Sequence, residues 1–220
     1  YGIIDDETVS FNVSLKKSGN NQGQIKEALE IVLKAIQNLN EKSDEYQNWL
    51  NALGYIYCSL SEYAKAIAVY NHSIEISQKD ADVENLHIGF HQKAMVLRLD
   101  KQYAEALDCI NREKEIITGY FKDDYLKLSV NEYEYGYILY LMDHIEAATL
   151  HMEKCLDSAL KTDDLIAQAC AYRGLAEICS KVNRQKQADD YFDKAYESFI
   201  KADDSIGAEE INQIRKNTRS

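Results

Sequence analysis

Hydrophobic residues recur along this chain at the spacing of an α-helix. In one stretch, Ala66, Ile67, Tyr70 and Ile74 fall on a single helical face, with polar residues between them. Proline is absent and glycine occurs only nine times, so little interrupts a helix. No apolar run approaches the roughly 18 residues of a membrane span. The pattern therefore predicts a chain that is helical over nearly its whole length and does not enter a membrane.

The helical pattern repeats about every forty residues. An alanine marks the same place in five segments, with steps of 38, 40, 42 and 40 residues: Ala28, Ala66, Ala106, Ala148 and Ala188. Twelve residues before the last four alanines stand small residues, Gly54, Ala94, Gly136 and Ala176. Four residues after each alanine stand large apolar ones, Val32, Tyr70, Ile110, Met152 and Phe192. Small residues on facing helices let two backbones approach closely, so the repeat predicts paired helices.

The segments between helices are short and polar, as antiparallel neighbours require. We expect the second helix of each pair to begin near Ser61, Lys101, Asp143 and Asn183, with the Ser, Asp and Asn residues as N-caps. Acidic pairs at 123–124, 163–164 and 203–204 also fall between helices. There they are interpreted as turn residues whose negative charge favours the start of a helix.

One repeat resembles a known family closely. The stretch 50–74 is similar to the tetratricopeptide repeat at Leu50, Leu53, Gly54, Tyr57, Tyr63, Ala66 and Tyr70. The other repeats match in part, and all keep one register over roughly 47–200. The usual repeat has about 34 residues, so the helices or linkers here are longer. Long repeats of this kind resemble those of kinesin light chains, spindle-orientation scaffolds and bacterial peptide-pheromone receptors.

The resemblance implies an all-α fold, a right-handed α-solenoid of antiparallel helical hairpins with a C-terminal capping helix. We expect residues 1–45 to form a degenerate leading hairpin, with helices over 6–17 and 24–39. Residues 46–203 would form four hairpins, and 204–220 a capping helix and tail, all within one continuous domain. The last helix is needed because a repeat array otherwise ends on an exposed apolar face.

In this family the first helix of each pair lines the inner surface. On that register the candidate partner-binding residues are Asn48, Asn51, Tyr55, His91, Arg98, Tyr133, Tyr137, Tyr140 and Arg173. Asparagines can donate to and accept from a peptide backbone, and tyrosines offer rigid contact area. The two arginines could hold a carboxylate by a two-pronged contact. Three alternatives stay open: tyrosines packed in the core, a groove filled by another part of the protein, and a surface with no specific ligand.

The predicted function is a non-catalytic scaffold that holds a protein or peptide segment in its concave groove. The alternative is a peptide-sensing regulatory domain of a larger bacterial transcription regulator or signalling protein. A formal charge of −12 disfavours nucleic acid and favours a basic or apolar partner segment. Association of identical copies stays open.

Catalysis and cofactors find no support in the sequence. Motifs for phosphate loops and nucleophile elbows are absent. His87 and His91 have an i, i+4 spacing that could hold a metal, with Glu84 a turn earlier, but no third strong ligand is evident. We therefore expect no enzyme activity, no metal and no cofactor. Five cysteines without a C-x-x-C pair, and a start without signal-peptide features, favour a cytoplasmic location.

Overall fold

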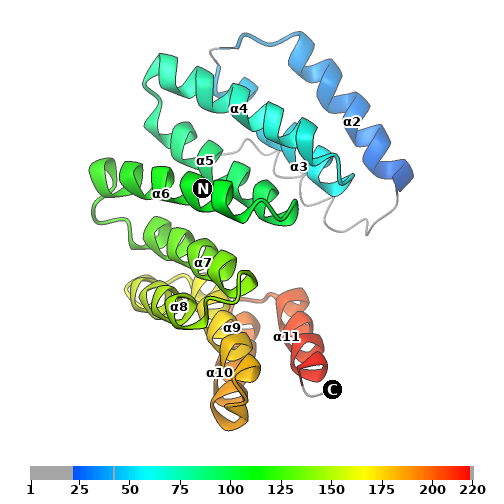
Figure 1. Ribbon diagram of the computed structural model, residues 1–220. Helices are drawn as coiled ribbons and strands as arrows, with labels where there is room; N and C mark the ends of the chain where they lie inside the picture. Colours follow the sequence, from blue (N-terminus) through cyan, green and yellow to red (C-terminus); the bar gives the residue numbers. More distant parts are fainter. Residues whose placement is uncertain (1–21, 42, 219–220) are drawn as a thin grey trace. The chain divides into compact units, whose positions relative to one another are not determined.

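The computed structural model describes residues 22–41 and 43–218, and the described residues form helices without any strand (Figure 1). The helices are α2 (Gln22–Gln37), α3 (Asp44–Ser59), α4 (Tyr63–Asp80), α5 (Val83–Leu99), α6 (Tyr103–Tyr120), α7 (Tyr125–Leu141), α8 (Ile145–Ala159), α9 (Leu165–Lys181), α10 (Gln185–Lys201) and α11 (Ser205–Asn217). The all-α prediction is confirmed. The helix predicted over 6–17 lies outside the described residues.

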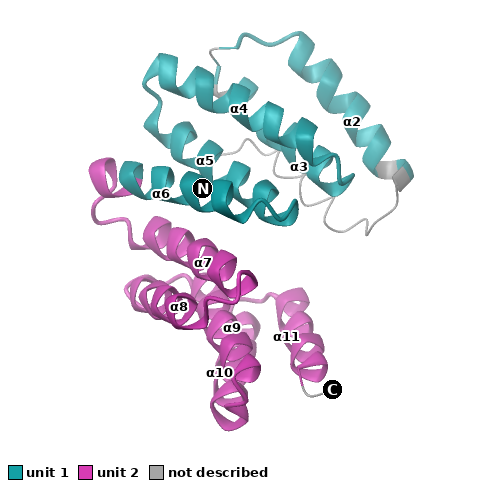
Figure 2. Ribbon diagram, viewed as in Figure 1, with its two compact units in different colours: residues 1–116 teal, residues 117–220 magenta. Residues whose placement is uncertain are grey.

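The chain divides into two compact units, residues 1–116 and 117–220 (Figure 2). Within the first unit, α3 packs on α4, α4 on α5 and α2 on α3. Within the second, α7 packs on α8, α8 on α9, α9 on α10 and α10 on α11. Successive helices joined by short turns are antiparallel, so each unit is built from hairpins. We call α3, α5, α7 and α9 the first helices and α4, α6, α8 and α10 the second helices.

The repeated alanines are contact points between helices, as the sequence predicts. All five are buried, and four of them have no exposed surface: Ala66, Ala106, Ala148 and Ala188. The large residues four positions later are also buried, at 0 or 1% exposure. The small residues on the first helices are buried too, so each hairpin closes where the repeat places its alanine.

Close approach is tightest in the first complete hairpin. A methyl group on Gly54 of α3 would lie 2.7 Å from both Cε2 and the hydroxyl oxygen of Tyr70 on α4, and closer still to its Cζ. The Tyr70 ring is 1% exposed, and its hydroxyl donates to the backbone oxygen of Asn51 at 3.4 Å. The ring therefore lies directly across Gly54, and only glycine leaves room for it.

The predicted N-caps of the second helices are wrong. The four residues Ser61, Lys101, Asp143 and Asn183 adopt left-handed conformations, with φ between 59° and 65°. Each follows the end of a first helix, and the next residue's amide donates back to a helix carbonyl, as Glu62 does to Tyr57 at 2.8 Å. This is the Schellman ending of a helix. The polar residues at these turns were misassigned because Ser, Asp and Asn suit both a left-handed turn and an N-cap.

The acidic residues between hairpins, in contrast, start α5, α7, α9 and α11. Asp124, Asp164 and Asp204 each accept a hydrogen bond from the amide three residues later, at 2.8–2.9 Å. Asp82 does the same for α5 at 3.0 Å. The side-chain oxygen satisfies an amide that lacks a partner within the helix. The interpretation of these residues as helix-start signals is confirmed.

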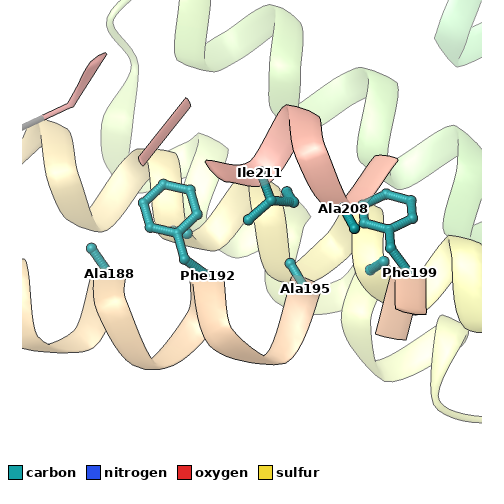
Figure 3. Close-up of a cluster of buried hydrophobic side chains, with 8 residues drawn as sticks. Ala188, Phe192, Ala195, Phe199, Ala208 and Ile211 are labelled. Carbon is teal, nitrogen blue, oxygen red and sulfur yellow. The ribbon is translucent and has the colours of Figure 1, made fainter. Parts of the chain in front are cut away.

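The last helix covers the apolar end of the second unit. Phe192, Ala195 and Phe199 of α10 pack with Ala208 and Ile211 of α11, and all five are at most 3% exposed (Figure 3). Outside this contact α11 is mostly polar, and Glu209 and Gln213 are exposed. The predicted capping helix is present.

Several polar side chains are also buried within hairpins. Glu113 on α6 stands where most repeats have a small residue, and it is 2% exposed. Its carboxylate lies 3.1 Å from Nδ1 of His91 on α5. Glu132 on α7 lies 2.6 Å from Nδ1 of His151 on α8. His151 therefore lies within a hairpin, against a buried carboxylate.

Candidate functional site

The nine predicted partner-binding residues divide between the first helices of the two units. Unit 1 carries Asn48, Asn51 and Tyr55 on α3 and His91 and Arg98 on α5. Unit 2 carries Tyr133, Tyr137 and Tyr140 on α7 and Arg173 on α9. Within their units, α3 contacts α5 and α7 contacts α9. In each unit, the predicted residues therefore lie on two first helices that contact each other.

In unit 1 these residues differ in their accessibility. Tyr55 is 38% exposed, whereas Asn48, Asn51 and Arg98 are half-buried. The side-chain oxygen of Asn51 is buried without a hydrogen-bond partner. His91 is held by Glu113 inside its own hairpin. Tyr55 thus offers surface directly, while His91 contributes first to hairpin packing.

In unit 2 the three tyrosines form a row along α7. The rings of Tyr133 and Tyr137 stack with centroids 5.9 Å apart, and those of Tyr137 and Tyr140 are 6.0 Å apart. All three residues are half-buried, so the row is not fully enclosed. Tyr135 faces the other way and stacks on His151 of α8 at 4.1 Å. Tyr135 therefore packs within the hairpin, away from the row.

Arg173 on α9 is already engaged within the unit. Its Nη2 donates to the hydroxyl of Tyr133, its guanidinium lies 5.6 Å from the centre of that ring, and Nη1 is 3.4 Å from a Glu210 oxygen. Its Nε is buried without a hydrogen-bond partner. The side chain is 19% exposed. A two-pronged grip on a carboxylate, as expected from the sequence, would require these contacts to be exchanged.

Lys181, two turns further along α9, is also paired. Its Nζ lies 2.7 Å from Asp143 and 4.7 Å from the centre of the Tyr140 ring. The lysine hydrogen bond holds the pKa of the Asp143 carboxyl below its ordinary value. Arg173 therefore contacts Tyr133 at one end of the tyrosine row, and Lys181 contacts Tyr140 at the other.

Glu177 lies between these two cations on α9. Burial raises the pKa of its carboxyl; attraction to Arg173 offsets part of that rise and repulsion from Glu210 adds to it. Burial also raises the pKa of Tyr133 and of Tyr140, and the charge of Glu177 adds to both shifts. The Glu177 carboxylate thus lies close enough to the two end tyrosines of the row to influence the pKa of both. We call Tyr133, Tyr137, Tyr140, Arg173, Glu177 and Lys181 the α7–α9 face.

Glu177 is not among the predicted partner-binding residues, although it falls on the first helix of its pair at a position that faces the inner surface in this repeat. Nothing in one sequence distinguishes it from the many exposed glutamates of an acidic chain. The signal that identifies it is tertiary, because its burial comes from packing among helices far apart in sequence.

The cysteines of the described residues are not activated as nucleophiles. All five cysteines are free thiols, and burial raises the pKa of each, which disfavours the nucleophilic thiolate. Within 22–41 and 43–218, no three His, Cys, Asp or Glu side chains are placed to hold a metal ion. No helix among the described residues is long and apolar enough to cross a membrane.

An open hollow lies elsewhere in unit 2, over the turn between α6 and α7. It is lined by residues 120–126 together with Lys161 and Thr162. None of these was predicted as a site residue. Two lysines lie over aromatic rings here, Lys127 over Phe121 and Lys161 over Tyr125, each at 5.0 Å. These contacts stabilise the turn and shape a shallow surface.

Comparison with known proteins agrees with the repeat pattern. The family model described as tetratricopeptide repeat matches residues 50–80. No curated protein matches the sequence significantly.

Solved structures resemble the chain over most of its length. BtubC (BKLC) from P. vanneervenii is 14% identical with a TM-score of 0.68, covering 86% of this chain and 76% of that one. A putative kinesin light chain of Podosopora anserina with nearly identical TPR-like repeats is 14% identical with a TM-score of 0.63, covering 86% and 93%. MamA from Desulfovibrio magneticus RS-1 is 17% identical with a TM-score of 0.52, covering 89% and 96%. At such identities the likeness is one of fold, and it supports a solenoid of tetratricopeptide-type helical hairpins.

Proposed function

We propose that this chain of tetratricopeptide-type hairpins is a non-catalytic scaffold that holds a segment of a partner protein against its first helices. The repeat is typical of protein-interaction scaffolds, and the fold itself supplies no chemistry. The observation that carries the proposal is the tyrosine row of α7, which remains partly accessible although the other side of the same helix is buried.

The row matches the dimensions of a short peptide. From Tyr133 to Tyr140 the helix rises about 10 Å, at roughly 1.5 Å per residue. An extended peptide of about three residues covers that length at roughly 3.3 Å each. Tyrosines supply large contact area with little side-chain entropy to lose, which suits a surface that must recognise a segment. The overall charge of −12 favours a segment that is basic or apolar.

The test compares two tyrosines that differ in position. A random peptide library is displayed on phage and selected against the wild-type chain, and the captured peptides are measured against two variants. Tyr137→Ala removes the middle ring of the row, and Tyr196→Ala removes a ring on α10 that is 38% exposed. We expect Tyr137→Ala to weaken binding about tenfold or more, as an aromatic anchor does, and Tyr196→Ala to leave it unchanged.

Circular dichroism and thermal melting confirm that both variants fold. Tyr55→Ala tests in the same way whether α3 contributes from unit 1. If Tyr137→Ala and Tyr55→Ala both bind all captured peptides as wild type does, the first helices are not the binding surface. If the library yields no peptide at all, the scaffold proposal fails.

A further inference from the structure

Resting on the proposed function, we propose that Glu177 receives a basic side chain, lysine or arginine, of the bound partner segment. The aliphatic part of that side chain would pack along the tyrosine row, and its cationic end would meet the carboxylate. Three properties of the α7–α9 face support this assignment: the partners of its own cations, the poor solvation of the Glu177 carboxylate, and the net charge of the surrounding side chains.

The two cations nearest to Glu177 in sequence are directed elsewhere. Arg173, four residues before it, donates to the Tyr133 hydroxyl and approaches Glu210 on α11. Lys181, four residues after it, is 2.7 Å from Asp143. Positions four apart on a helix are neighbours, and both could have paired with Glu177. No hydrogen bond or ion pair within 4 Å joins Glu177 to either residue, so its carboxylate is left for another cation.

The solvation of Glu177 is poor for a carboxylate without a close partner. Burial raises the pKa of its carboxyl, and the attraction of Arg173 does not reverse the rise. Half-buried in the described structure, this group has lost water without gaining hydrogen bonds. Charged groups in that condition are destabilised, and a cation brought next to them recovers part of the loss. The face is therefore preorganised for a positive group.

The charged side chains around the tyrosine row carry a net negative charge, which suits a basic ligand. Arg173 and Lys181 of α9 pair with Glu210 of α11 and with Asp143 of the turn after α7. The charges of Arg173 and Glu210 also act on the carboxyl of Glu177. With Glu177, Asp143 and Glu210 all ionised, three carboxylates oppose two cations, so the α7–α9 face together with the two ion-pair partners has one uncompensated negative charge. A basic side chain neutralises it, whereas an acidic one would add a like charge.

The aromatic rings support the same assignment. Arg173 and Lys181 already lie over the faces of Tyr133 and Tyr140, at 5.6 and 4.7 Å. The row is therefore compatible with cations in contact with its rings, which attract them through the electron-rich face. Lysine and arginine also carry long apolar stems that cover aromatic surface while the charged end reaches a polar partner.

The experiment uses defined peptide pools as probes. Four pools of acetylated, amidated hexapeptides have random uncharged residues at five positions and one fixed residue: lysine, arginine, norleucine or glutamate. Norleucine matches the lysine stem without its charge. Binding to the whole chain is measured by fluorescence anisotropy for wild type, Glu177→Gln and the control Glu153→Gln. Glu153 is exposed on α8, so the control removes the same charge away from the face.

For wild type, we expect the lysine and arginine pools to bind about tenfold more tightly than the norleucine pool, as a charge-assisted contact of modest strength implies. Glu177→Gln should remove this preference and keep norleucine binding, whereas Glu153→Gln should keep the preference. Affinity for the lysine pool should rise with pH as the carboxyl ionises, and Glu177→Gln should abolish that dependence.

Three results would overturn the inference. Equal binding of lysine and norleucine pools by wild type rejects it while leaving the scaffold function intact. A lysine preference that survives in Glu177→Gln, or that disappears equally in Glu153→Gln, rejects Glu177 as the acceptor. Failure of every pool to bind wild type rejects both the inference and the proposed function.

Discussion

The sharpest test of the helix packing is the substitution Gly54→Ala. The added methyl carbon would lie 2.7 Å from Cε2 of Tyr70, whereas carbon atoms in contact prefer about 3.5–4.0 Å. The ring must therefore move by about 1 Å, but it is 1% exposed and its hydroxyl is bonded to the Asn51 backbone. Overpacking of this kind costs about 1–3 kcal/mol. Alanine regains up to about 1 kcal/mol of helix propensity, so we expect a net loss of about 1–2 kcal/mol.

The matched control is Gly119→Ala, in the last turn of α6. A methyl group there meets nothing within 4 Å, and neither glycine has a left-handed backbone. The control should therefore be neutral or gain up to about 1 kcal/mol. Stability is measured by urea unfolding followed by circular dichroism, with thermal melting as a check. For a chain of this length, 1 kcal/mol corresponds to about 2–4 °C in Tm.

A double substitution separates the clash from other effects. Replacing Tyr70 by leucine creates space beside residue 54, so Gly54→Ala should cost less in the Tyr70→Leu background than in wild type. The reasoning is refuted if Gly54→Ala is as stable as wild type, or if its cost is unchanged when Tyr70 is leucine. Either result would mean that the two helices do not meet at this glycine.

Two further predictions concern charge and helix caps. Because burial raises the pKa of Glu177 in the folded state, ionisation of this carboxyl destabilises the fold. Wild type therefore loses stability as the pH rises from the pKa of the unfolded chain through the higher pKa of the folded chain. Glu177→Gln lacks the ionisable group and does not show this loss. The variant should therefore match wild type in acid and exceed it near pH 8 in urea unfolding; a less stable variant at pH 8 would contradict this. Asp164→Ala removes the cap on the Ala167 amide and should cost about 0.5–2 kcal/mol, while Asp163→Ala should cost little; equal losses would reject the cap.

The sequence alone determined the periodic part of this protein. A small residue, an alanine and a large apolar residue at constant offsets are enough to place two helices in contact, because packing density allows few other arrangements. The same periodicity put Tyr135 and Tyr137 on opposite faces of α7, since one helical face cannot hold both. Fold class, hairpin register and capping helix follow from local spacing, which one sequence contains in full.

The pairing of polar groups, in contrast, depends on the folded chain. Asp143 and Asp164 look alike as sequence, yet the first adopts a left-handed turn and the second caps a helix. Arg173 looked available for a carboxylate, yet Tyr133 and Glu210 hold it. The raised pKa of the Glu177 carboxyl comes from its burial between helices. Hydrogen bonds and charges act between side chains brought together from distant positions, so their partners depend on coordinates, whereas the apolar repeat depends mainly on spacing along the chain.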